Sequence, residues 1–163
     1  MGDLFGPEDA ESVSIGGVEV ICRMSGRETD GAYSVLEFHL DPGRLIPPHA
    51  HRREHEVSYV LEGEIGVRIA SAELTATQGC MVVKRPQVTH AWWNATGHPA
   101  RVLEVISPAG FEHYFRELAE IHASTGLREP QLVADLQDRY GVSPSADWIP
   151  RLRARHGLKL LGE

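Results

Sequence analysis

The sequence predicts an all-β fold, an antiparallel sandwich or barrel, followed by a short helical region at the C-terminus. From Ser12 to Pro108 the chain consists of short β-type apolar runs that are broken by turn residues. The regular spacing of these runs favours antiparallel strands over a parallel sheet with helical crossovers. After Pro108 the apolar residues change to helical spacing, which predicts helices there.

Composition and charge limit the class of protein. The chain has 163 residues, 42% of them apolar and 24% charged, which favours one folded domain and argues against disorder. Acidic residues outnumber basic ones 23 to 16, and the net charge of −7 repels nucleic acids and anionic membrane surfaces. No apolar run is long enough to span a bilayer, and the N-terminus lacks the features of a signal peptide. We therefore expect a cytoplasmic protein that binds neither nucleic acid nor membranes.

The two cysteines, Cys22 and Cys80, cannot form a disulfide framework, and neither lies in a C-x-x-C motif. We expect both to be small buried apolar side chains.

The predicted strands follow one another closely along the first two thirds of the chain. Their expected ranges are 18–22, 33–40, 57–61, 65–69, 81–83, 90–93 and 102–106. Helical spacing then predicts a helix over 110–123, a second that ends before Gly141, and a third that carries Trp148 and is capped by Ser143 or Ser145.

The domain organisation follows from these elements. We expect a flexible N-terminus over 1–11, a β-barrel over 12–108, and C-terminal helices over 109–163. About fifty residues are too few for a second core, so the helices should pack on the barrel.

A cluster of histidines indicates a metal site. His49 and His51 are two residues apart, so on a strand both imidazoles point to the same face. Glu56 begins the next strand and could turn inward, and His90 would supply a third imidazole. Three nitrogens and one carboxylate are good ligands for a divalent first-row metal and leave positions open for water or substrate.

These residues lie in two longer motifs. The first is Gly43-x5-His49-x-His51-x4-Glu56-x6-Gly63, and the second is Gly79-x10-His90-x3-Asn94. The pair resembles the two conserved motifs of the cupin superfamily. Two positions depart from the second family motif: Pro86 lies one position late, and Val88 replaces a glycine.

The resemblance implies a cupin-type double-stranded β-helix, also called a jelly-roll barrel. It also implies a metal centre with the ligands His49, His51, Glu56 and His90. The segment from Ser107 to Phe115 resembles the chain that leaves the barrel in single-domain, quercetin-dioxygenase-like cupins.

Strand alternation identifies candidate residues around the metal. Ser58 and Val60 follow Glu56 on the inward face, and Trp92 shares the face of His90. We therefore consider Ser58, Val60 and Trp92 candidate substrate-binding residues, with ordinary barrel packing an equal alternative for Trp92. His55 should point away from the metal, because it is adjacent to Glu56.

The resemblance implies a metal-dependent enzyme. In related dioxygenases the glutamate is both ligand and base, so Glu56 is the candidate catalytic residue. The expected function is a dioxygenase or other oxidoreductase that acts on a small enolisable aromatic or polyketide-like compound. The cofactor would be one divalent transition metal: Fe, Mn, Ni, Co, Cu or Zn.

Two alternatives remain open at this point. One is a cyclase or isomerase that uses the same metal without oxygen chemistry, and the other is a metal-containing small-molecule-binding protein without turnover. Because a small barrel exposes sheet edges, we also expect a homodimer.

Overall fold

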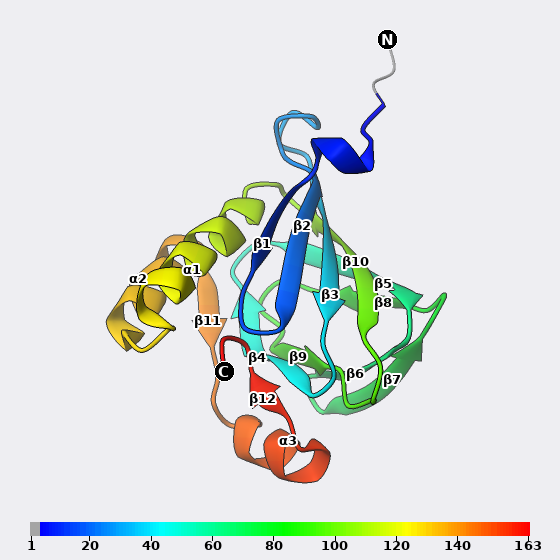
Figure 1. Cartoon of the computed structure of the whole chain (residues 1–163), viewed down its shortest axis with the longest axis vertical. Helices are drawn as coiled ribbons and strands as arrows, with labels where there is room; N and C mark the ends of the chain where they lie inside the picture. The colour runs from blue at the N-terminus through cyan, green and yellow to red at the C-terminus, as the bar shows by residue number, and fades with distance from the viewer. Residues whose placement is uncertain (1–3) are drawn as a thin grey trace.

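The computed structural model describes residues 4–163, and it consists of two antiparallel β-sheets with helices at one side and at one end (Figure 1). The first sheet has the strand order β1-β2-β3-β10-β5-β8. Its strands are β1 (Glu11–Ser14), β2 (Val18–Met24), β3 (Ser34–Leu40), β10 (Ala100–Ser107), β5 (His55–Glu62) and β8 (Met81–Lys84).

The second sheet has the order β11-β4-β9-β6-β7, and β12 pairs with β4 in parallel. Its strands are β11 (Val142–Pro144), β4 (Arg44–His51), β9 (His90–Trp93), β6 (Glu64–Ile69), β7 (Ala72–Thr77) and β12 (Lys159–Leu160).

The hydrophobic core fills the space between the sheets. Side chains alternate along β2 and β10, so that Val20 and Val102 are buried on the inner face. They belong to the same cluster as Ile46 and Ile65 from the second sheet. This architecture confirms the predicted all-β jelly-roll barrel.

Each predicted strand is present, with ends shifted by one or two residues. Strand β7 was not predicted from the sequence, because its Ala, Glu and Thr residues carry little β-type apolar signal and most are exposed. The burial predicted for Cys80 is wrong: Cys80 is exposed, in the turn between β7 and β8, whereas Cys22 on β2 is half-buried and packs against the core.

The helices are η1 (Pro7–Asp9), α1 (Glu112–Thr125), α2 (Pro130–Arg139) and α3 (Ile149–His156). The capping of the last helix by Ser143 or Ser145 is wrong. The N-cap is Trp148, without a side-chain hydrogen bond, and a proline in the first turn removes one N–H that a cap would satisfy. Ser143 lies instead in β11, opposite Ala50.

The C-terminal region packs on the barrel. Helices α1 and α2 lie together at one side of it, and their Leu118 and Leu136 join the main core (Figure 1). Helix α3 packs through Leu152 on a second cluster with Leu45 and Trp93. The region thus contributes three helices and also the strands β11 and β12.

The predicted flexible segment 1–11 includes residues 1–3, which lie outside the described residues; of the rest, Pro7–Asp9 forms η1, and β1 begins at Glu11. Within residues 4–163, no helix combines the length and apolar character needed to cross a bilayer.

Candidate metal centre and cavity

The structure brings together the four predicted ligands. His49 and His51 lie at the end of β4, Glu56 near the start of β5, and His90 at the start of β9. Strands β4 and β9 are paired with His49 opposite His90, while β5 belongs to the other sheet. One ligand atom from each side chain lies within 4.8 Å of the other three.

Backbone carbonyls orient two of the imidazoles. His49 Nδ1 lies 2.7 Å from the Pro47 carbonyl oxygen, and His90 Nδ1 lies 3.1 Å from that of Val88. Because a carbonyl only accepts, each Nδ1 carries the hydrogen, which leaves the Nε2 lone pair for a metal. His49 Nε2 is 3.1 Å from His51 Nε2, which is itself 3.3 Å from Glu56 Oε1.

The electrostatic environment sets the protonation that ligands need. Burial holds the pKa of His49 well below its usual value, and the neighbouring imidazoles of His90 and His51 lower it further. Burial also lowers the pKa of His90. Burial raises the pKa of Glu56, but Lys84 and His51 outweigh this and keep it well below the usual value. The site therefore favours the neutral imidazoles of His49 and His90 beside an ionised Glu56 carboxylate.

These residues fit a divalent metal. Glu56 Oε2 lies 3.0 Å from His90 Nε2 and 3.3 Å from Lys84 Nζ, and His90 Nε2 is buried without a hydrogen-bond partner among the described residues. An unpaired buried polar atom costs about 1–3 kcal/mol, and a cation shared by His90 and Glu56 would remove this cost for His90 Nε2. Three imidazole nitrogens and a carboxylate suit Fe, Mn, Ni, Co, Cu or Zn.

A buried ion pair that was not predicted from the sequence adjoins the candidate metal centre. Lys84 is 2% exposed, and its Nζ lies 2.8 Å from Glu104 Oε1 and 3.3 Å from Glu56 Oε2. Ser58 donates a hydrogen bond of 2.9 Å to Glu104 Oε2. Burial raises the pKa of Glu104 to about 7, although Lys84 opposes the shift. The available signal was alternation, because Glu104 shares the inward face of Val102 and Ile106.

The candidate metal-binding group adjoins a cavity of about 320 Å³, which it lines with His49 and Glu56. Its polar wall is formed by His49, Glu56, Lys84 and Glu104. The barrel and α1 supply an aromatic and aliphatic wall, consisting of Phe38, Ile46, Pro47, Pro48, Trp92, Phe111, Tyr114 and Phe115. The C-terminal region closes the remaining side with Gln137, Val142, Pro144, Ser145, Ala146, Ile149 and Leu161.

Of the three candidate substrate-binding residues, only Trp92 lines the cavity. The Trp92 ring packs edge-on against Phe38. Ser58 and Val60 are buried but do not belong to the cavity lining; Ser58 holds Glu104, and Val60 lies in the core. His55 is exposed on the opposite face of β5 from Glu56.

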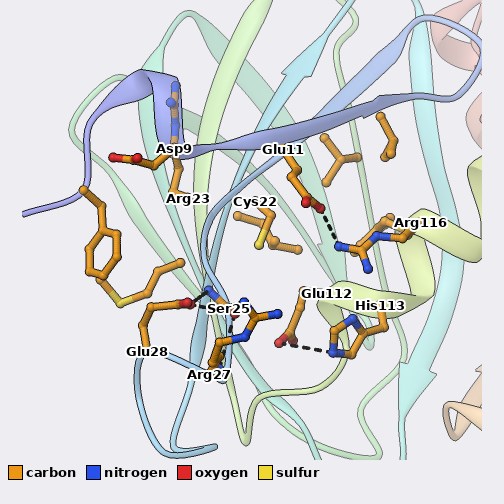
Figure 2. A pocket seen from close by; sticks show the side chains of 16 residues that line it. Asp9, Glu11, Cys22, Arg23, Ser25, Arg27, Glu28, Glu112, His113 and Arg116 are labelled. Atoms are coloured by element: carbon orange, nitrogen blue, oxygen red, sulfur yellow. Dashed lines mark hydrogen bonds and ion pairs between the residues drawn. The ribbon is translucent and has the colours of Figure 1, made fainter.

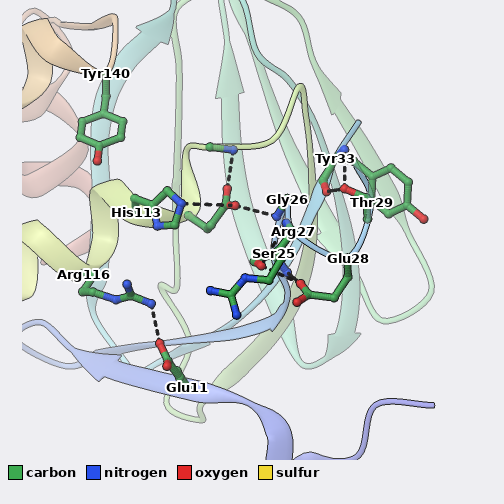
Figure 3. Close-up of polar contacts among 12 residues, drawn as sticks. Glu11, Ser25, Gly26, Arg27, Glu28, Thr29, Tyr33, His113, Arg116 and Tyr140 are labelled. Atoms are coloured by element: carbon green, nitrogen blue, oxygen red, sulfur yellow. Dashed lines mark hydrogen bonds and ion pairs between the residues drawn. The ribbon is translucent and has the colours of Figure 1, made fainter. Parts of the chain in front are cut away.

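A second cavity, of about 260 Å³, lies between the N-terminal segment, β2 and α1 (Figure 2). Two of its carboxylates have partners within the cavity: Arg116 contacts Glu11, and Ser25 donates a hydrogen bond to Glu28. The Glu112 carboxylate accepts hydrogen bonds from the N–H groups of Gly26 and Gly110. Figure 3 shows Arg116 directed toward Glu11, and Ser25 beside Glu28. Across residues 4–163, the only group of His, Cys, Asp and Glu with metal-ligand geometry is the one in the first cavity, so we place the functional site there.

Fold and site together define a jelly-roll protein with a group of three histidines and one glutamate that could hold a metal ion. A family model described as the cupin domain matches residues 36–106, a range that includes all four ligands. Residues 36–106 therefore match a cupin domain, as the two motifs predicted.

Solved structures show the same fold. KdgF from Halomonas sp. has a TM-score of 0.61 at 16% identity, with 68% of this chain and 99% of that chain covered. A predicted oxalate decarboxylase from Thermotoga maritima has a TM-score of 0.58 at 20% identity (65% and 99% covered). The polyketide cyclase RemF from Streptomyces resistomycificus has a TM-score of 0.56 at 21% identity (66% and 80% covered). No curated protein sequence matches the chain significantly. At these identities the structures establish the fold and not the reaction.

Proposed function

We propose that the protein is a metal-dependent enzyme of the dioxygenase type, and that its substrate is a small enolisable aromatic or polyketide-like compound. The observation that carries this proposal is that the four-residue group reaches a largely apolar cavity through two of its members, His49 and Glu56. A volume of about 320 Å³ suits a small molecule, and the rings of Trp92 and Phe111 provide flat apolar surfaces for a planar one.

The metal centre, Glu56 and the aromatic wall would each have a separate role in this reaction. A bound divalent metal would act as a Lewis acid toward a substrate oxygen and support the reaction with dioxygen. Glu56 is held ionised beside Lys84, so it can accept the proton of a substrate hydroxyl group that lies against it. The aromatic wall would keep water away from the deprotonated substrate.

One observation favours a cyclase or isomerase as the second candidate. Lys84 and Glu104 place an acid and a base on the same cavity wall as Glu56. These groups could transfer protons to and from a substrate without any oxidation. The polyketide cyclase RemF has the same fold. A small-molecule-binding protein without turnover is the remaining alternative.

Oxygen uptake tests the proposal directly. Protein loaded anaerobically with each of the six metals would be mixed with flavonols and other enolisable phenols, and oxygen consumption would be followed in an electrode cell. We expect metal-dependent uptake that is lost in Glu56→Gln and His49→Ala. The matched control is His55→Ala, because His55 is a neighbouring histidine that points to solvent.

The other outcomes separate the alternatives. Products formed in the absence of oxygen, detected by mass spectrometry, would identify a cyclase or isomerase. Binding with neither uptake nor product would favour the binding protein. Failure of the wild-type chain to retain any of the metals would contradict all metal-dependent functions. The homodimer stays a prediction, and sedimentation equilibrium would test it.

A further inference from the structure

Lys84 is a buried cation with unused hydrogen-bonding capacity. Its ammonium group has three N–H bonds, and among the described residues it contacts only two acceptors, Glu104 Oε1 at 2.8 Å and Glu56 Oε2 at 3.3 Å. The side chain lines the cavity, and Nζ lies 5.5 Å from the centroid of the Trp92 ring. At least one N–H therefore has no oxygen or nitrogen acceptor among the described residues, and a molecule inside the cavity could supply one.

The position of Lys84 relative to the metal-binding group is fixed by Glu56. The same oxygen, Glu56 Oε2, lies 3.0 Å from His90 Nε2 and 3.3 Å from Lys84 Nζ. A molecule that places one oxygen at the metal centre can therefore place a neighbouring oxygen at Lys84. The rest of the wall is largely apolar, so a ligand without such an oxygen would leave a buried N–H unpaired.

We propose that Lys84 determines substrate specificity by binding an acidic oxygen of the substrate, whose adjacent oxygen lies at the metal centre. The substrate class is then an aromatic or conjugated compound with two neighbouring oxygens, one of them a carboxylate, enolate or phenolate. This inference rests on the proposed function, because it needs a substrate at the metal centre.

Two probes of the same shape test this role. Salicylate carries a carboxylate beside its phenol, whereas salicyl alcohol carries a neutral hydroxymethyl group at the same position. Binding of each to the Co(II)-loaded protein would be measured by calorimetry, with the cobalt absorption spectrum as a second readout.

The variants remove the cation in two ways. Lys84→Met keeps an unbranched side chain that is one atom shorter and uncharged, and Lys84→Met/Glu104→Gln also removes the carboxylate that would otherwise be left unpaired in the core. The control is Arg85→Met, which removes a neighbouring cation that is exposed to solvent. Circular dichroism would check folding, and elemental analysis would measure the bound cobalt.

The expected result is selective. Both Lys84 variants should weaken salicylate binding by about 10- to 100-fold, the range expected for one hydrogen bond to a charged group. Salicyl alcohol binding should change by less than about 3-fold, and Arg85→Met should change neither. If Lys84→Met does not fold, the double variant decides the question.

Three results would overturn the inference. They are an equal loss of affinity for both probes, unchanged salicylate binding in the folded variants, and no salicylate binding by the wild-type holoprotein. Each of them leaves cobalt bound. Failure of the wild-type chain to bind cobalt would instead overturn the proposed function, and the role of Lys84 with it.

Discussion

The docking of α3 through Leu152 can be tested by removing part of this side chain. Leu152 is 0% exposed and packs in a cluster with Leu45, Ala91, Trp93 and Leu158. Leu152→Ala deletes three carbon atoms from this cluster, and such a change costs about 2–5 kcal/mol because of lost burial and the cavity left behind. An isolated helix of eight residues is unstable in water, so α3 depends on this contact. We expect a loss of about 3 kcal/mol.

Urea unfolding would measure the change in the free energy of unfolding, and native-state hydrogen exchange would locate it. The amide protons of α3 should exchange faster in the variant, whereas those of β10 should lose only the global change in stability. The control is Leu132→Ala on α2, where the side chain is 46% exposed and the expected cost is below about 0.5 kcal/mol. A loss below 1 kcal/mol for Leu152→Ala would refute the assignment of this cluster as the anchor of α3.

Three further predictions follow from other contacts. Gly66→Ala should destabilise the barrel by about 2 kcal/mol or more, because an added Cβ would lie 2.2 Å from the Trp93 ring. Urea unfolding would measure the change, and an unchanged midpoint of the urea transition would contradict this prediction. Burial raises the pKa of Glu37, but hydrogen bonds from Arg101, His39 and Arg23 outweigh this and hold it at about 2. The ion pairs of Glu37 should therefore stabilise the fold above about pH 4.5 and lose this effect as the pH falls toward 2. Over that interval the free energy of unfolding of the wild type should fall by about 1–2 kcal/mol more than that of Glu37→Gln, after allowance for solvent screening. Zn²⁺ at 100 times its dissociation constant should stabilise the wild type by about 2.7 kcal/mol in thermal unfolding; equal stabilisation of a variant that lacks His90 would argue against the site.

The sequence predicted the metal-binding group because its signal is local. His49 and His51 share a strand face, and the fixed spacings to Glu56 and His90 belong to motifs that place those residues on neighbouring strands. Lys84 carried no such signal, since a lysine at the end of a short strand is usually exposed. Its burial depends on Glu104, which is twenty residues away in the sequence and lies on a different strand.

The C-terminal region was the hardest part to predict, because its strands exist only through their partner. Strands β11 and β12 have three and two residues, too few to show a period of their own. Both pair with β4: Val142 lies opposite His51, and Lys159 lies opposite Arg44. The strand that carries two of the four ligands would be an edge of its sheet without them, since its only other neighbour is β9. The segment that covers this edge also supplies Val142, Ile149 and Leu161 to the cavity wall. The C-terminal region therefore does two things for the site: it satisfies the backbone beside the histidines and encloses the space in front of them.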